Sequence, residues 1–182
     1  MENKNNEENN SEQSFKLVVF ELDKEEYAVE ITELQEIINI PEITPVPNAP
    51  KFIKGILNLR GKISVVVDLE KRFDLVREFE NKEEGNVIIT EVEGNNFGVI
   101  VDKVSEIITV QATNIQPTPA LISTKIHADY LKGVVVIDDE EVKTKEKTEN
   151  DNSRLLILLD LKRMLKEEEL LKFGKAVKEV VK

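Results

Sequence analysis

The chain has 182 residues, of which 40% are hydrophobic, and this fits one domain or two small subdomains that share a core. The net charge of −11 argues against nucleic acid or an anionic membrane surface as the main partner. Cysteine is absent, which excludes disulfides and zinc–thiolate sites. The acidic N-terminus has no signal-peptide pattern and no apolar run could span a bilayer, so we expect a cytoplasmic protein.

The first part of the chain predicts a tail followed by short strands. Residues 1–14 are polar, and we predict that they form a disordered N-terminal tail. Two apolar runs rich in β-branched residues, 17–22 and 27–31, flank a turn at 23–26 and predict a β-hairpin. Prolines between positions 41 and 50 exclude a long helix there. Gly55 is expected to end a short helical turn that begins near Pro50.

Residues 55–64, GILNLRGKIS, predict a second hairpin with Arg60 and Gly61 at its corner. Gly61 can adopt a positive φ without steric cost, as such a corner requires. From its residue type alone, Arg60 is expected to be a solvated turn residue.

The second half of the chain repeats the order of the first. Residues 87–92 and 97–110 match residues 17–22 and 27–40, which lie 70 positions earlier. Then 130–133 (YLKG) matches 52–55 (FIKG), and 157–161 (ILLDL) matches 65–69 (VVVDL). We therefore predict an internal duplication, mainly β, with one small barrel at 15–85 and another at 86–165.

Two further segments lie outside this duplicated pattern. The second half contains a charged insertion at 138–152, which we predict to be a solvent-exposed loop. Apolar residues of 161–182 recur at helical intervals, and we predict a C-terminal helix over 166–182 that packs on its own domain.

No catalytic constellation is recognisable in the sequence. His127 is the only histidine, and the acidic run 138–141 lacks the ligand spacing and glycine of a calcium loop. Asp68 and Asp160 occupy equivalent repeat positions and could do acid–base chemistry, but capping of the helical turns that follow is the stronger interpretation. We expect no catalytic residue, metal or cofactor; an unrecognised small-molecule enzyme is the remaining alternative of that class.

Residues 52–69, FIKGILNLRGKISVVVDL, closely resemble the signature of the CheW family, the coupling proteins of bacterial chemotaxis. The resemblance extends from about Phe15 to Leu165. It implies two packed five-stranded SH3-like barrels. It also implies a non-enzymatic adaptor that couples the cytoplasmic tips of chemoreceptors in membrane arrays to the histidine kinase CheA. A CheW-like adaptor of a surface-motility or other receptor–kinase pathway is an alternative.

The resemblance also implies two binding surfaces. A receptor groove between the barrels would be formed by Leu34, Glu36, Gly55, Arg60, Gly98 and Val104. A kinase face at the end of the first barrel would contact the regulatory domain of CheA through Ile38, Ile40, Ile43 and Val46. Glycines in the receptor groove would let a receptor helix approach the backbone closely, and Arg60 would reach a carboxylate of the partner.

Overall fold

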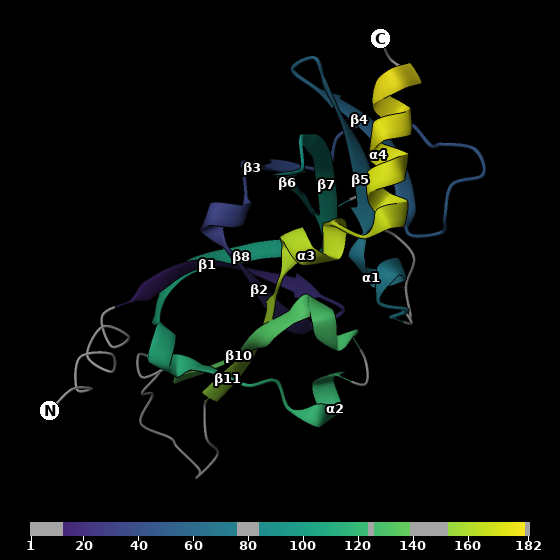
Figure 1. Cartoon of the computed structure of the whole chain (residues 1–182). Coiled ribbons are helices and arrows are strands. Elements are labelled where there is room, and N and C mark those ends of the chain that lie inside the picture. The colour runs from purple at the N-terminus through teal and green to yellow at the C-terminus, as the bar shows by residue number, and fades with distance from the viewer. Residues whose placement is uncertain (1–12, 76–83, 124–125, 139–152, 181–182) are drawn as a thin grey trace, which may run out of the picture.

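The computed structural model describes residues 13–75, 84–123, 126–138 and 153–180 (Figure 1). The predicted disordered tail at 1–14 and the predicted exposed insertion at 138–152 fall almost wholly outside the described residues. Their edges are ordered, since the first strand begins at Ser14 and the strand before the insertion runs to Asp138.

The described strands form two sheets. The first sheet has the order β8-β1-β2-β11-β10-β9 and the second has the order β3-β6-β7-β5-β4. The strands of the first sheet are β1 (Ser14–Leu22), β2 (Glu25–Glu30), β8 (Lys103–Gln111), β9 (Ile115–Gln116), β10 (Leu131–Asp138) and β11 (Ser153–Leu159). Those of the second are β3 (Glu36–Asn39), β4 (Ile53–Leu59), β5 (Lys62–Asp68), β6 (Asn86–Val92) and β7 (Asn95–Val101).

The two halves of the chain exchange their first hairpins. Hairpin β1–β2 joins the sheet built from β8 to β11, while hairpin β6–β7 joins the sheet built from β3 to β5. Each exchange is made by a parallel pair, β2 with β11 and β5 with β7. The prediction of separate barrels at 15–85 and 86–165 is therefore wrong in its boundaries. Periodicity within a strand identifies the strand but carries no information about a partner far away in sequence.

The strand pairing supports the internal duplication. Tyr27 pairs with Ile157 in the first sheet, and Phe97 pairs with Val65 in the second. The sequence repeat aligns Tyr27 with Phe97 and Ile157 with Val65, so the two pairs occupy equivalent positions. Gly55 and Gly133 lie at matching register shifts, with φ values of 152° and 150°. The sixth strand of the first sheet, the short β9, corresponds to an isolated bridge between Thr44 and Ile56 in the second.

The described residues form three apolar clusters. The central cluster lies between the sheets and takes side chains from both, including Phe20, Tyr27, Val67, Phe97 and Leu159. Each sheet also has a cluster on its other side; the one on the second sheet, here called the second-sheet cluster, contains Leu57, Val66, Val87, Ile89 and Ile100. Strands buried on both faces explain the unbroken apolar runs, because neither face needs polar residues.

The helices are short apart from the last. They are η1 (Ile31–Glu33), α1 (Leu69–Arg72), η2 (Ala112–Asn114), α2 (Ala120–Ser123), η3 (Ala128–Tyr130), α3 (Leu161–Leu165) and α4 (Glu168–Val180). Helix α4 packs on β5 and β7 and buries Leu170 in the central cluster, as the amphipathic pattern predicts (Figure 1). A Cβ at Gly174 would lie 3.4 Å from Cβ of Asn95, so the helix passes close to β7 at this glycine. The predicted fold class is confirmed: mainly β, with two packed sheets and a C-terminal helix.

Candidate partner-binding site

The β4–β5 hairpin turns tightly at Arg60 and Gly61. Both residues have a positive φ, 53° and 82°, as in a type I′ turn, whose twist matches that of the flanking strands. The side-chain oxygen Oδ1 of Asn58 accepts a hydrogen bond of 2.9 Å from the Gly61 amide. The local sequence thus fixes the corner and projects the Arg60 side chain from it.

Arg60 pairs with a carboxylate of its own chain. Its two terminal nitrogens donate to the two oxygens of Glu36 on β3, each at 3.1 Å. The side chain of Arg60 stays 77% exposed and that of Glu36 28% exposed. Both residues belong to the receptor groove that the family resemblance implies, where Arg60 is predicted to meet a carboxylate of the partner. The structure joins them across 24 positions and leaves the outer part of the guanidinium accessible.

A hollow of about 410 Å³ lies beside this ion pair. It is lined by Gln35, Glu36, Leu59, Arg60, Lys62, Ser64, Ile89 and Asn96. The walls combine apolar and polar side chains, and Ser64 among them is buried with 1% exposure. Such a surface of mixed polarity suits contact with another protein better than enclosure of a small molecule.

Leu34 and Val104 lie where the chain passes between the two sheets. Both are half-buried and pack against the central cluster. Leu34 follows η1, which leads from β2 of the first sheet to β3 of the second. The amide of Val104 on β8 donates to the side-chain oxygen of Asn86 on β6 at 3.0 Å, so β8 of the first sheet is tied to the second.

The two groove glycines face their own protein. A Cβ at Gly55 would lie 2.2 Å from the carbonyl oxygen of Thr44, and one at Gly98 would lie 2.8 Å from Cγ1 of Val87. Both glycines are buried, and Gly55 belongs to strand β4 instead of ending a helical turn. The structure thus supplies a reason for both glycines within the protein itself, and the approach of a receptor helix stays a prediction. Their missing side chains make room for the chain's own strands.

Three residues of the predicted kinase face do come together. Ile38, Ile40 and Ile43 are half-buried and pack against the second-sheet cluster. Val46 is half-buried in the loop before β4 and does not belong to that cluster. The isoleucines therefore close one side of the second sheet while leaving part of their apolar surface exposed.

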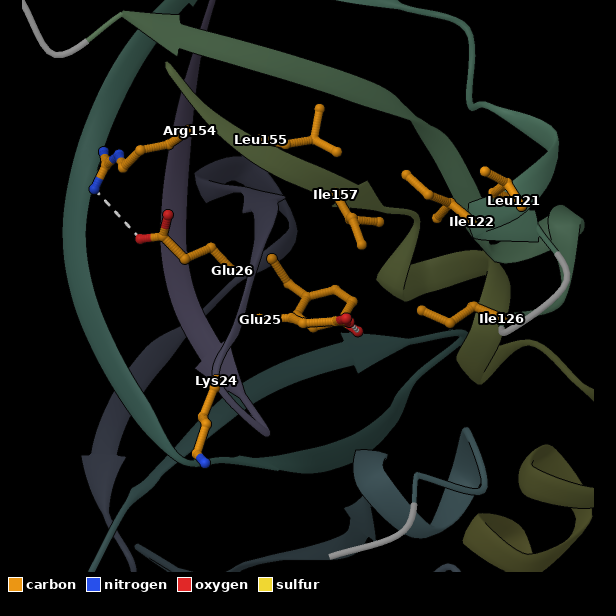
Figure 2. Close-up of a pocket in the computed structure, with 10 residues that line it drawn as sticks. Lys24, Glu25, Glu26, Leu121, Ile122, Ile126, Arg154, Leu155 and Ile157 are labelled. Atoms are coloured by element: carbon orange, nitrogen blue, oxygen red, sulfur yellow. Dashed lines mark hydrogen bonds and ion pairs between the residues drawn. The ribbon is translucent and has the colours of Figure 1, made fainter. Parts of the chain in front are cut away.

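A second hollow was not anticipated from the sequence. It measures about 470 Å³ and lies on the first sheet, lined by Lys24, Glu25, Glu26, Tyr27, Leu121, Ile122, Ile126, Arg154, Leu155 and Ile157 (Figure 2). Burial raises the pKa of Tyr27, whose hydroxyl stays protonated and donates to Glu25 at 3.0 Å.

At the edge of this hollow Arg154 donates to Glu26 at 3.3 Å and to Glu106 at 2.5 Å. Glu106 lies 70 positions after Glu36. Each sheet therefore has a glutamate–arginine pair, and the glutamates of the two pairs occupy the same position of the repeat. That offset is a sequence signal for Glu106, whereas the role of Arg154 follows only from the structure.

The residues considered for chemistry have structural roles. Asp68 caps α1 through the amides of Glu70 and Lys71, and Asp160 caps α3 through the amide of Arg163. The side chain of His127 is 65% exposed beside Asp129. Within the described ranges no cluster of three or more histidine, cysteine or acidic side chains could hold a metal. In the same part of the chain no helix is long and apolar enough to cross a membrane.

Comparisons with known proteins agree on one family. The model of the CheW-like domain matches residues 16–169. A chemotaxis protein CheW of Treponema pallidum is 33% identical over 90% of this chain and 89% of its own length. One of Klebsiella aerogenes is 32% identical over 84% and 82%. The crystal structure of the scaffolding protein TtCheW from Thermoanaerobacter tengcongensis aligns with a TM-score of 0.69 and 32% identity, covering 86% of this chain and 91% of that one. On sequence, on length and on fold, this chain belongs to the CheW family of chemotaxis proteins.

Proposed function

We propose that this protein is a non-enzymatic adaptor that couples the cytoplasmic tips of chemoreceptors to the regulatory domain of the kinase CheA. The protein would work in the cytoplasm at membrane receptor arrays. The observation that carries the proposal is the Arg60–Glu36 pair at the rim of a mixed hollow, in a chain of this family. A charged, geometrically fixed group on an accessible surface suits specific recognition of another protein.

One surface is proposed for each partner, and the two adjoin, since Leu59 and Ile89 line the hollow beside Arg60 and also belong to or pack against the second-sheet cluster. Arg60 lies at the corner of hairpin β4–β5, whereas Ile38, Ile40 and Ile43 form an apolar surface over the second-sheet cluster. An acidic group on the receptor tip would compete with Glu36 for the guanidinium. The kinase would instead bury the exposed parts of the isoleucines.

The test measures both partners with the same variants. Purified protein is titrated with a receptor tip fragment and, separately, with the CheA regulatory domain. We expect Arg60→Ala to weaken receptor binding by about 2 kcal/mol and to leave kinase binding unchanged. We expect Ile43→Asp to weaken kinase binding and to leave receptor binding unchanged. Arg60→Lys should restore receptor binding only in part, since an ammonium cannot form the two parallel hydrogen bonds.

Melting curves of the same variants serve as the control. An exposed pair such as Arg60–Glu36 contributes less than about 1 kcal/mol to stability, so Arg60→Ala should unfold close to the wild-type temperature. A receptor affinity that is unaffected by Arg60→Ala would remove Arg60 from the receptor groove. A wild-type protein that binds neither fragment would refute the proposed function.

A further inference from the structure

Ion pairs stabilise the segment of the chain that crosses from the first sheet to the second. Helix η1 makes this crossover, with Glu30 just before it and Glu33 at its end. Leu34 comes next, and the amide of Gln35 then donates to the carbonyl oxygen of Ile89 on β6 at 2.8 Å. Any movement of η1 relative to the first sheet would therefore also move Leu34.

One lysine contacts both glutamates. Lys132 on β10 places its ammonium 2.9 Å from Oε1 of Glu30 and 3.2 Å from Oε1 of Glu33. From the opposite side, the hydroxyl of Thr90 on β6 donates to the carbonyl oxygen of Glu33. The second sheet thus holds the backbone of the crossover, while a lysine of the first sheet holds its two side chains.

Glu33 makes this arrangement sensitive to the loss of its partner. The residue is 8% exposed, and its second oxygen, Oε2, is buried without a hydrogen-bond partner in the described part of the chain. A buried carboxylate that loses its counter-charge must find water or protonate, because an isolated buried charge is costly. The short helix is the segment that would open to let water in.

We propose that Lys132 is a positioning residue for the receptor groove: by holding Glu30 and Glu33 it fixes η1, and thereby Leu34, between the two sheets. This inference rests on the proposed function, since it assumes that Leu34 contacts the receptor. Lys132 itself need not touch the receptor.

The test compares Lys132→Met with Lys132→Arg in the full chain. Methionine keeps the length of the side chain and removes its charge, so receptor-tip binding should weaken about fivefold or more while binding of the CheA regulatory domain stays unchanged. Arginine should restore receptor binding. Amide chemical shifts of Leu34 and Gln35 should move in Lys132→Met and return toward wild type in Lys132→Arg. The double variant Glu33→Gln with Lys132→Met should recover part of the binding, because the neutral amide needs no counter-charge.

Lys54→Met is the matched control, since Lys54 occupies the position of Lys132 in the other repeat and loses the same charge. It should bind the receptor like the wild type. The proposal is overturned if Lys132→Met leaves receptor binding and the two amide shifts unchanged. It is equally overturned if binding of both partners falls in parallel with the melting temperature. A wild-type protein that does not bind the receptor tip refutes the proposed function instead, and the amide shifts then still report whether Lys132 fixes Leu34.

Discussion

Single residues in this protein act through partners that lie far away in sequence. Arg60 occupies a corner that its own hairpin explains, yet the carboxylate it meets comes from β3. Gly98 and Gly55 have neighbours that only the folded strands bring near. Residue type and local pattern identify positions of interest, whereas the contact that gives each position its role is tertiary.

Gly98 provides a prediction at this scale. Gly98→Ala would place a Cβ 2.8 Å from Cγ1 of Val87 in the second-sheet cluster. We expect a loss of about 1–3 kcal/mol in the free energy of unfolding, as for other overpacked cores. Adding Val87→Ala removes the clashing methyl group and should restore part of the stability. Urea denaturation measures both effects; a fully stable Gly98→Ala with selective loss of receptor binding would contradict this assignment.

Glu33 gives a dependence of stability on pH. Burial raises the pKa of Glu33, and the nearby Asp160 and Glu30 act in the same direction, while Lys132 opposes them. The folded state therefore holds the proton to a higher pH than the unfolded state does. This contribution to stability is present at low pH and is lost as the pH rises through the folded-state pKa.

Glu33→Gln removes this titration. As the pH rises from the ordinary pKa of a glutamate through the raised folded-state pKa of Glu33, the wild type should lose unfolding free energy relative to the variant. Denaturation series at several pH values, with the wild type measured in parallel, test the difference. A difference that is constant with pH would show that Glu33 is not perturbed.

At the scale of elements, the repeated strands β5 and β11 have equivalent packing. Val67 is the last residue but one of β5 and Leu159 is the last residue of β11. They pair with Ile53 and Leu131 and are 0% and 1% exposed in the central cluster. We expect Val67→Ala and Leu159→Ala each to cost about 1–3 kcal/mol of unfolding free energy, because strand ends can relax around the cavity.

Leu121→Ala is the control for these truncations, since Leu121 is 83% exposed on α2. It should change stability by less than about 0.5 kcal/mol. Thermal melts compare the three variants under one condition. Unchanged stability of both strand variants would be incompatible with the repeat alignment of 65–69 with 157–161.

At the scale of the whole molecule, the exchanged hairpins make the two halves depend on each other. Among the described strands, hairpin β1–β2 has β8 and β11 as its other neighbours, and hairpin β6–β7 has β3 and β5. A chain cut at the boundary that the sequence repeat indicates would therefore leave both sheets incomplete. The central cluster would also lose half of its contributors, since both sheets supply it.

We accordingly expect fragments 1–85 and 86–182 to lack cooperative unfolding when each is alone. Mixing them should restore a cooperative transition, because each supplies the hairpin that the other lacks. Circular dichroism during urea titration, with the intact chain as reference, measures this. A cooperative transition of fragment 1–85 by itself would contradict the exchange.

The sequence by itself determined the hairpins at 17–31, 55–64 and 87–101, the duplication, the caps at Asp68 and Asp160, the C-terminal helix and the family. These depend on local periodicity, on side chains within a few positions, or on the order of matching blocks, and all of these can be read along the chain. Only the tertiary structure decided which sheet receives each hairpin, why Gly55 and Gly98 are glycines, that Arg60 meets Glu36, and that Lys132 holds Glu30 and Glu33. The physical reason is common to these cases: each joins atoms from strands distant in sequence, and packing between the two sheets selects that arrangement from the many that the same local patterns permit.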